Sequence, residues 1–309
     1  MVTGPGPAAE RLPVDHTRAA PATPSPGLAE RLRAVRGFVL DLDGTLVLGD
    51  RGHRGLRPLP GAVELVRWLA RRQLPYRIFT NGTGRSPREY AQVLRQVGFE
   101  VPDGSVLTPA SSAADLFLRR GHHRVVALGA GLWQPLRDAG IEAVEPAGRP
   151  RADAVLVGLH REFTMDELEA ACHAVWSGAR VYSCSQAAFF ATADGPAMGT
   201  SRALSAMIAS VTGCRVELVG KPSRHALRGA GRRLGVRLRD LAVVGDDPAL
   251  EVPMAHRGRA LAVAVGTGLG AADAYDDLPD SRRPHLLVRG VDELLALCRA
   301  AHREPYRTE

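Results

Sequence analysis

Short apolar segments alternate with helix-like segments along most of the chain, and this alternation constrains the fold more than any other feature. The expected strands are residues 39–42, 76–79, 125–128, 154–157, 181–184, 216–219, 241–244 and 260–265. Residues 62–72 have apolar side chains at helical spacing, and capping boxes begin further helices after Ser86 and Thr164. Strands that alternate with helices are typical of a parallel sheet covered by helices, so we expect an α/β fold.

Composition excludes several other classes of protein. The chain has 309 residues, of which 45% are hydrophobic, as in an ordinary globular protein. No apolar run approaches the roughly 20 residues of a membrane span, and the first residues lack the pattern of a signal peptide. We therefore expect a cytoplasmic protein without a membrane partner. Residues 1–30, rich in Pro, Ala and Gly, are expected to form a disordered leader.

Charge and cysteine usage narrow the range of partners and cofactors. The net charge is +7, but nearly all the cations are arginines spread along the chain without a basic block. This distribution argues against a nucleic-acid partner. The cysteines, none of which forms a C-x-x-C pair, are Cys172, Cys184, Cys214 and Cys298. We expect buried free thiols rather than a zinc site or a disulfide framework.

Polar residues gather directly after several of the expected strands. In chain order they are Asp41, Asp43, Thr80, Asn81, Gly82, Lys221, Asp246 and Asp247. Parallel sheets bind ligands beyond the carboxyl ends of their strands, so we expect these residues to meet. Carboxylates beside an ammonium group and hydroxyl and amide donors suit a divalent cation together with a phosphate.

The two aspartates after the first strand need a partner for their charge. In an extended strand, Asp41 and Asp43 would point the same way and lie about 6.6 Å apart. Two unit charges at that distance repel by about 2.5 kcal/mol at an effective dielectric constant of about 20. A hard cation would offset this repulsion, with Asp246 as a further oxygen ligand. The alternative is that one aspartate caps a turn while the other is solvated.

Lys221 is the only lysine in the chain. Lysine presents a compact charge that approaches one oxygen in a crowded pocket, whereas arginine brings a planar fork. We therefore expect Lys221 to contact the phosphate. The alternative is that one lysine remains by chance in a chain whose composition has drifted toward arginine. Thr80, Asn81 and Gly82 offer a hydroxyl group and amides as further phosphate donors, but Thr-Asn-Gly after a strand is also a common turn.

Four short motifs occur in the order D-L-D-G-T-L, T-N-G, G-K-P and G-D-D. As a set they resemble the four motifs of the haloacid dehalogenase-like phosphohydrolases. The segments L-P-G-A-V-E-L, V-G-L-H-R-E-F-T and V-G-K-P-S are similar to the NagD-like subgroup, which includes p-nitrophenyl phosphatases and pyridoxal phosphate phosphatase. The resemblance covers about residues 37–289.

The resemblance implies a Rossmann-like parallel-sheet core of residues 31–121 and 215–309, with an α/β cap domain inserted at residues 122–214. It also implies a magnesium-dependent phosphatase that hydrolyses a small-molecule phosphate monoester through an aspartyl-phosphate intermediate. Caps of this subgroup often pair, so a homodimer through the cap is a further expectation. Sugar phosphates, pyridoxal phosphate, phosphoglycolate and nucleotides all fit a capped pocket, so the substrate stays open.

The same resemblance implies a role for each motif residue. Asp41 resembles the nucleophile and Asp43 the general acid and base. The residues that resemble the phosphate binders are Thr80, Asn81, Gly82 and Lys221. The side chains of Asp41 and Asp246 and the backbone carbonyl of Asp43 would hold Mg²⁺.

Two positions depart from the pattern of the subgroup. Glu251 stands where the subgroup usually has a second aspartate, so either Glu251 or Asp247 would complete the metal shell. Residues 183–186 read Ser-Cys-Ser-Gln where the subgroup often has Thr-Asn-Pro-Asp. The candidate substrate contacts in the inserted segment are His160, Ser185 and Gln186, with a surface-loop position as the alternative for each.

Three other functions remain open from the sequence. A signalling receiver domain also surrounds a phosphorylated aspartate with acidic residues, a threonine and a lysine, but receivers are much shorter and lack such an insertion. A catalytically inactive scaffold would bind partners through the cap, although the full acidic set argues against it. A phosphotransferase would pass the phosphoryl group to an acceptor other than water.

Overall fold

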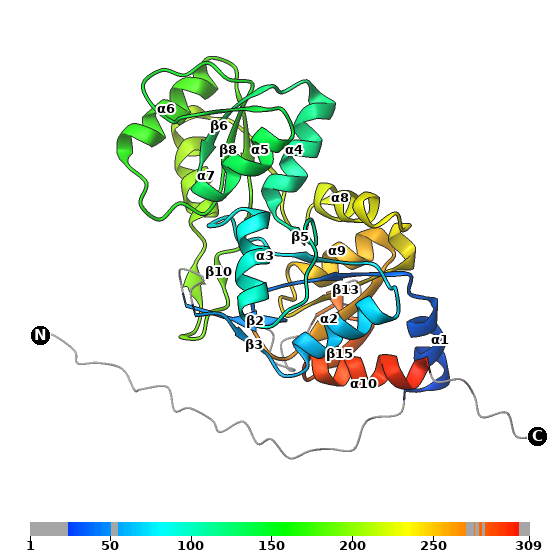
Figure 1. Ribbon diagram of the computed structural model, residues 1–309. Helices are drawn as coiled ribbons and strands as arrows, with labels where there is room; N and C mark the ends of the chain where they lie inside the picture. The colour runs from blue at the N-terminus through cyan, green and yellow to red at the C-terminus, as the bar shows by residue number, and fades with distance from the viewer. Residues whose placement is uncertain (1–23, 51–54, 270–274, 276–277, 280–281, 303–309) are drawn as a thin grey trace, which may run out of the picture.

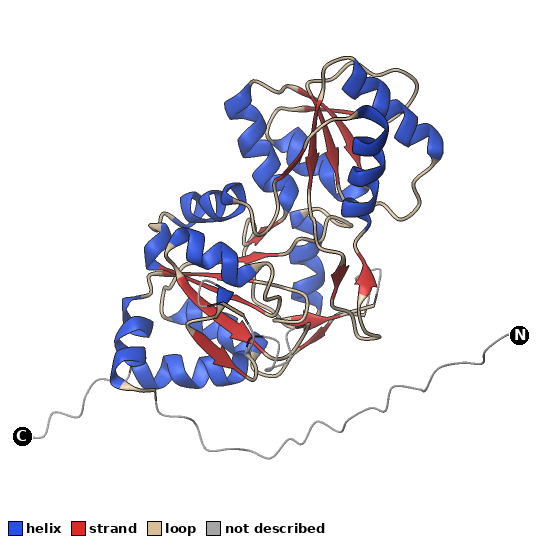
Figure 2. Ribbon diagram, turned by 180° about the vertical axis from the view of Figure 1, so that it is seen from behind, coloured by secondary structure: helices blue, strands red, loops and turns tan. Residues whose placement is uncertain are grey.

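Two parallel sheets, one in each lobe of the molecule, organise the fold (Figures 1 and 2). This computed structural model describes residues 24–50, 55–269, 275, 278–279 and 282–302. The upper lobe in Figure 1, drawn mainly in green, is built from the middle of the sequence, whereas the lower lobe combines the blue and red segments from either side. Within the described ranges, no helix combines the length and apolar character that crossing a membrane requires.

A six-stranded parallel sheet forms the core lobe, in the order β15-β14-β13-β1-β4-β5. Its strands are β1 (Gly37–Leu40), β4 (Tyr76–Phe79), β5 (Val106–Leu107), β13 (Leu241–Gly245), β14 (Leu261–Val265) and β15 (Leu286–Val288). The strands β1, β13 and β14 are buried along their whole length. This burial on both faces explains their continuous apolar sequences.

Helices cover both faces of the core sheet. One face packs against α1 (Pro26–Ala34), α2 (Ala62–Arg71), α3 (Pro87–Gln96) and α10 (Val291–Ala301). The other face packs against α8 (Arg224–Leu234) and α9 (Glu251–Gly258). The apolar side chains that predicted α2 are the ones it buries, so the helical spacing of its sequence sets the face that meets the sheet.

The second lobe is a cap built on a five-stranded parallel sheet in the order β12-β9-β8-β6-β7. Its strands are β6 (Arg124–Leu128), β7 (Glu142–Val144), β8 (Ala154–Val157), β9 (Arg180–Ser183) and β12 (Val216–Leu218). One face packs against α4 (Pro109–Arg120) and α5 (Trp133–Asp138), and the other against α6 (Met165–Trp176) and α7 (Thr200–Thr212). The predicted Rossmann-like core with an inserted α/β cap is therefore confirmed.

Two short hairpins connect the lobes. The core contributes β2 (Val47–Leu48) and β3 (Arg57–Pro58), and the cap contributes β10 (Phe189–Phe190) and β11 (Ala197–Met198). The backbone N–H of Ala193, in the loop of the cap hairpin, donates to the carbonyl oxygen of Gly49 at 2.8 Å. This bond fixes the cap hairpin against the segment of the core that follows β2.

Several local predictions are confirmed. The strands expected at residues 76–79 and 154–157 have these bounds in the structure. Both capping boxes form: at the start of α3, the Ser86 hydroxyl accepts from the N–H of Glu89, and the Glu89 carboxylate accepts from the N–H of Ser86. The equivalent box of Thr164 begins α6. Local side-chain chemistry therefore determines where these helices begin.

The predicted domain boundaries are wrong at three places. Strand β12, expected in the core, pairs with β9 in the sheet of the cap. Helix α4, also expected in the core, packs against the strands of the cap. Apolar patterning identifies a strand or helix but does not say which sheet it joins. The predicted leader, residues 1–30, extends too far because α1 begins at Pro26; residues 1–23 lie outside the described residues.

Candidate active site

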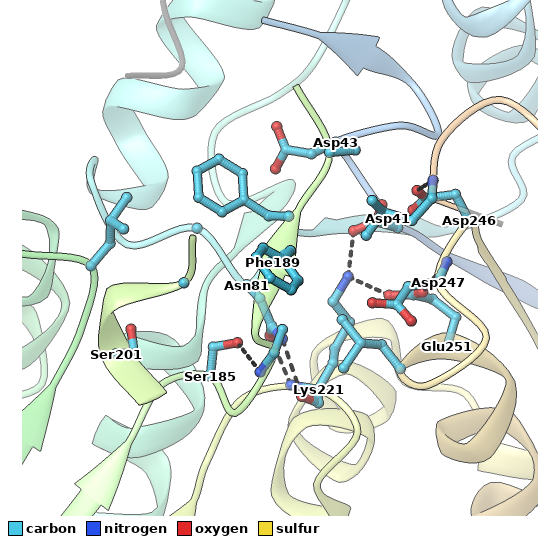
Figure 3. A pocket seen from close by; sticks show the side chains of 18 of the residues that line it. Asp41, Asp43, Asn81, Ser185, Phe189, Ser201, Lys221, Asp246, Asp247 and Glu251 are labelled. Atoms are coloured by element: carbon cyan, nitrogen blue, oxygen red, sulfur yellow. Dashed lines mark hydrogen bonds and ion pairs between the residues drawn. The ribbon is translucent and has the colours of Figure 1, made fainter. Parts of the chain in front are cut away.

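Residues that follow β1, β4, β12 and β13 converge on one pocket between the core and the cap. The predicted site residues that line it are Asp41, Asp43, Asn81, Gly82, Ser185, Lys221, Asp246, Asp247 and Glu251 (Figure 3). Strand β1 ends at Leu40, so Asp41 and Asp43 lie in the loop that follows rather than in an extended strand. The separation expected from the strand rise therefore does not apply to them.

Lys221 lies at the base of the pocket and is 1% exposed. Its ammonium group contacts Oδ1 of Asp41 and lies 2.6 Å from Oε1 of Glu251 (Figure 3). Burial disfavours the charged form, but the two carboxylates outweigh burial and raise the pKa of Lys221. Lys221 therefore carries a positive charge at neutral pH, between two buried acids.

Asp41 is buried and held from several sides. Its backbone N–H donates to the carbonyl oxygen of Val244 at 2.8 Å, which ties the loop after β1 to β13. Its Oδ2 accepts a hydrogen bond of 3.1 Å from the hydroxyl of Thr45, while Lys221 contacts Oδ1. Burial raises the pKa of Asp41, and nearby Asp43 adds to this effect although Lys221 opposes it. The carboxylate therefore has a fixed orientation and incomplete charge compensation.

Asp246 lies close to the backbone of Gly44, where the absence of a side chain makes room for its carboxylate. Gly44 has a φ of +86°, and a Cβ atom there would lie 2.4 Å from Oδ2 of Asp246. The same oxygen accepts a hydrogen bond of 2.7 Å from the N–H of Leu269. Burial, followed by the charges of Asp41 and Glu251, raises the pKa of Asp246 well above its usual value. Gly44 in the first motif thus allows the last motif to approach it.

Glu251 and Asp247 are the two candidates to complete the metal shell, and the side chain of Glu251 faces Lys221. Its side chain is almost completely buried, and its second oxygen, Oε2, accepts from the N–H of Asp247 at 3.2 Å. Burial raises the pKa of Glu251 to about 8 despite the opposing charge of Lys221. The Asp247 carboxylate accepts from the N–H of Ala249 at 2.7 Å, at the turn before α9, and burial raises its pKa as well. In this arrangement Glu251 orients Lys221.

The donor chemistry of the pocket suits a hard cation. Five acidic residues and one lysine line it. Burial raises the pKa values of four of these acids, and all five carboxyl groups share the pocket with the ammonium group of Lys221. Carboxylate oxygens are the ligands that Mg²⁺ prefers in proteins. Across the described ranges, however, no three His, Cys, Asp or Glu side chains come together in a geometry that would hold a metal ion.

The Thr80-Asn81-Gly82 segment holds its neighbours in place. The hydroxyl of Thr80 donates to Oδ2 of Asp43 at 3.0 Å and accepts from the N–H of Gly82 at 2.8 Å. The Asn81 amide donates to the carbonyl oxygen of Lys221 at 3.1 Å and accepts from its N–H at 2.8 Å. A Cβ atom at Gly220 would lie 2.7 Å from this amide oxygen. Thr80 and Asn81 thus position Asp43 and Lys221, and phosphate binding by this segment stays a prediction.

Of the three candidate substrate contacts in the cap, one lines the pocket and two do not. Ser185 lines the pocket, and its hydroxyl accepts from the N–H of Ala187 at 3.1 Å. The structure does not bring His160 to the pocket, because its Nε2 lies 3.1 Å from the Glu167 carboxylate of the α6 capping box. Gln186 is exposed and also lies outside the pocket lining. A position at the end of a cap strand therefore does not by itself place a side chain in the site.

The uncharged side of the pocket is not apparent from the motifs. The additional lining residues include Leu159, Phe189, Phe190, Ala191, Thr200, Ser201, Leu250 and Leu269. A usable signal was present, because Phe189 and Phe190 are followed by Asp194-Gly195, and an Asp-Gly pair between apolar residues is typical of a hairpin. The hairpin was therefore detectable from the sequence, but its contact with the pocket was not.

Several known proteins resemble this chain. The family described as haloacid dehalogenase-like hydrolase matches residues 38–142, and the family described as HAD-hydrolase-like matches residues 218–294. The 5'-nucleotidase YutF of Bacillus subtilis is 27% identical over 266 residues, which cover 85% of this chain and 98% of YutF. The phospholysine phosphohistidine inorganic pyrophosphate phosphatase of Rattus norvegicus is 30% identical, covering 78% of this chain and 86% of that protein. The structure of NagD from Escherichia coli K-12 matches with a TM-score of 0.73 and 25% identity, covering 84% of this chain and 98% of NagD.

Proposed function

Because the chain belongs to the haloacid dehalogenase-like hydrolases, in their NagD-like subgroup, and is a phosphohydrolase, we propose that it hydrolyses small-molecule phosphate monoesters with Mg²⁺ as cofactor. The reaction would form an aspartyl-phosphate on Asp41. The observation that carries this proposal is the buried contact between Lys221 and Asp41 at the base of the pocket. This contact supports the proposal that Asp41 acts as the nucleophile beside a cation that would face the phosphate group.

In the first proposed step, a carboxylate oxygen of Asp41 attacks phosphorus while the bond from phosphorus to the ester oxygen breaks. The leaving oxygen takes a proton from the carboxyl group of Asp43. The hydroxyl of Thr80, which donates to Asp43 at 3.0 Å, holds that group toward the pocket. Lys221 stabilises the negative charge that develops on the transferred group.

In the second step, water attacks the phosphorus of the aspartyl-phosphate and the bond from phosphorus to the Asp41 oxygen breaks. Asp43, now ionised, takes the proton of the attacking water. The products are inorganic phosphate and the original Asp41 carboxylate. The contact of Ala193 with Gly49 keeps the cap hairpin over the site, which limits the access of bulk water.

The residues that would hold Mg²⁺ are Asp41 and Asp246, through their carboxylates, and Asp43, through its backbone carbonyl. The bound ion would offset the repulsion between the Asp41 carboxylate and the phosphate. Leu269 orients the Asp246 carboxylate through its N–H. The contact of Glu251 with Lys221 supports a role in holding that lysine, which leaves Asp247 as the candidate to complete the metal shell.

The substrate is proposed to be a small phosphorylated metabolite. YutF, one of the similar proteins, is named a 5'-nucleotidase, so nucleoside 5'-monophosphates belong in any substrate screen. We also retain the proposal of a cytoplasmic location, which is supported by the four cysteines being free thiols. A fluorescent fusion of the full chain, followed by cell fractionation, would test this location.

A homodimer through the cap is supported by an apolar face on α6 and α7. Four large side chains on this face are exposed: Met165, Trp176, Met207 and Val211. An apolar patch of this kind is typical of an interaction surface. Light scattering is expected to give twice the chain mass of 33.0 kDa for the wild type and the single mass for Trp176→Glu. A wild-type monomer at all concentrations would contradict the dimer.

Phosphate release from p-nitrophenyl phosphate tests the proposed function. We expect the wild type to turn over with Mg²⁺ and to lose most of its activity after treatment with EDTA. Asp41→Asn should release no phosphate. Asp103→Asn is a matched control, because this carboxylate is 88% exposed and pairs with Arg95 on the surface. Comparable release by Asp41→Asn and the wild type would contradict the nucleophile, and activity that survives chelation would contradict the metal.

A further inference from the structure

The pocket has one charged side and one uncharged side. Its charged lining residues all belong to the four motifs except Glu251; they are Asp41, Asp43, Lys221, Asp246, Asp247 and Glu251. The described lining residues of the cap carry no charge; they are Leu159, Ser185, Ala187, Phe189, Phe190, Ala191, Gly199, Thr200 and Ser201. A bound ester would place its phosphate against the charged side, so its leaving group would face the cap.

Phe189 is the large aromatic side chain that the cap presents most openly to this pocket. It is 55% exposed although it lines the same pocket as Asp41, Asp43 and Asn81 (Figure 3). Large exposed aromatic rings at a pocket wall are typical of ligand contacts rather than of the folded core. The ring therefore offers an apolar face that a leaving group would cover.

The backbone holds Phe189 in a defined position. Phe189 pairs with Met198 in the cap hairpin, and the N–H of Gly199 donates to the carbonyl oxygen of Ala188 at 2.8 Å. At the far end, the hairpin loop is tied to the core by the bond from Ala193 to Gly49. A ring carried on a fixed hairpin discriminates between shapes better than one on a free loop.

We propose that Phe189 is a specificity-determining residue that stacks on a flat, uncharged ring in the leaving group of the substrate. This inference rests on the proposed phosphatase function. A flat ring makes an extended contact with an aromatic face, whereas a saturated ring of the same size does not. A leaving group with a carboxylate or a second phosphate would lose its water against side chains that offer it no cation. An aryl group and a nucleoside base both satisfy this chemistry.

The test compares kcat/KM for esters that differ only in ring shape or charge. Benzyl phosphate and cyclohexylmethyl phosphate are both esters of primary alcohols and differ in the flatness of the ring. The carboxylate of 4-carboxybenzyl phosphate adds charge, a nucleoside 5'-monophosphate places the flat ring on a sugar, and glycerol 3-phosphate has no ring. The wild type should prefer benzyl phosphate to its cyclohexylmethyl and carboxylated analogues.

Phe189→Leu should lower kcat/KM for benzyl phosphate or the nucleotide by about threefold to tenfold, mainly through KM, and leave glycerol 3-phosphate unchanged. Sensitivity of only one of these two esters identifies the source of the flat ring. Met198→Ala is the matched control, since it changes the hairpin partner of Phe189 outside the pocket lining.

Equal sensitivity of all esters to Phe189→Leu, or a wild-type preference for the carboxylated or saturated ester, would overturn this inference alone. No phosphate release from any ester would overturn the proposed function, and this inference with it.

Discussion

The core and cap sides of the pocket differ in how each side chain is held and in what the sequence reveals of it. On the core side, acidic residues and Lys221 are buried and bonded to one another, as in the contacts that Lys221 makes with Asp41 and Glu251. On the cap side, Phe189 is half exposed and uncharged. The core side therefore suits chemistry on a phosphate group, and the cap side suits discrimination between leaving groups. Substitutions on the two sides should separate these roles.

After the complete loss expected for Asp41→Asn, the largest effect is expected for Lys221→Met, which removes the cation between two buried acids. Loss of one charged donor at a reacting group lowers kcat by about 10² to 10³-fold. Breaking a buried pair also destabilises a fold by about 3–5 kcal/mol, because the remaining charges are uncompensated. Steady-state kinetics and thermal unfolding measure both effects. Lys221→Arg should restore the charge but little of the activity, since the planar guanidinium does not fit the fully enclosed site. Full activity of Lys221→Met would contradict the assignment of the phosphate chemistry to the core side of the pocket.

A smaller effect is expected for Glu251→Gln, which keeps the size of the side chain and replaces the carboxyl group that faces Lys221. A hydrogen bond to a charged group contributes about 1.5–3 kcal/mol, so kcat/KM should fall by about tenfold to a hundredfold. The loss should appear at saturating Mg²⁺, because Glu251 contacts Lys221 and is not assigned as a ligand. Restoration of wild-type activity by raising the Mg²⁺ concentration would instead show that Glu251 acts through the metal.

Asn81→Asp should have a still smaller effect on catalysis. The carboxylate would keep the bond from the N–H of Lys221 but lose the one donated to its carbonyl oxygen. Two acceptors would then face each other, at a cost of about 1–3 kcal/mol in the free energy of unfolding. Chemical denaturation with and without inorganic phosphate would measure this cost. An unchanged free energy of unfolding would show that Asn81 does not position the Lys221 loop.

The smallest effect on the core chemistry is expected from the cap side. Phe189→Leu should leave the hydrolysis of glycerol 3-phosphate unchanged while it weakens the hydrolysis of esters with flat rings. A uniform loss of activity with every ester would mean that the two sides of the pocket are not separable in the way their polarity indicates.

The sequence predicted the core side well because each motif residue has a local chemical reason for its identity. A lone lysine and several acids at strand ends are visible without knowledge of the fold, and Lys221, Asp41 and Asp246 do meet in one pocket. The hydrogen-bond partners of the site residues were harder to predict from the sequence. Phosphate binding by Thr80 and Asn81 stays a prediction, whereas the bonds of their side chains to Asp43 and Lys221 were not foreseen. Which partner a polar side chain takes depends on the tertiary approach of separate segments.

The cap side was not predictable to the same degree. The strand β12 has the same apolar pattern as the strands of the core, yet it joins the sheet of the cap. His160 lies near the end of a cap strand, yet it pairs with Glu167 of the following helix. Phe189 lines the pocket on a hairpin whose loop is bonded to the core through Ala193. These outcomes depend on how the two lobes pack, which local patterning does not encode.

The most direct test of the central proposal is to trap the covalent intermediate. Wild-type protein turning over a phosphate monoester with Mg²⁺ is quenched and reduced with borohydride, which converts an aspartyl-phosphate to homoserine. Peptide mass spectrometry is expected to find this conversion at Asp41 alone, and to find none without substrate. Rapid phosphate release with no conversion at Asp41, or with conversion at Asp43 or Asp246 instead, would contradict the account.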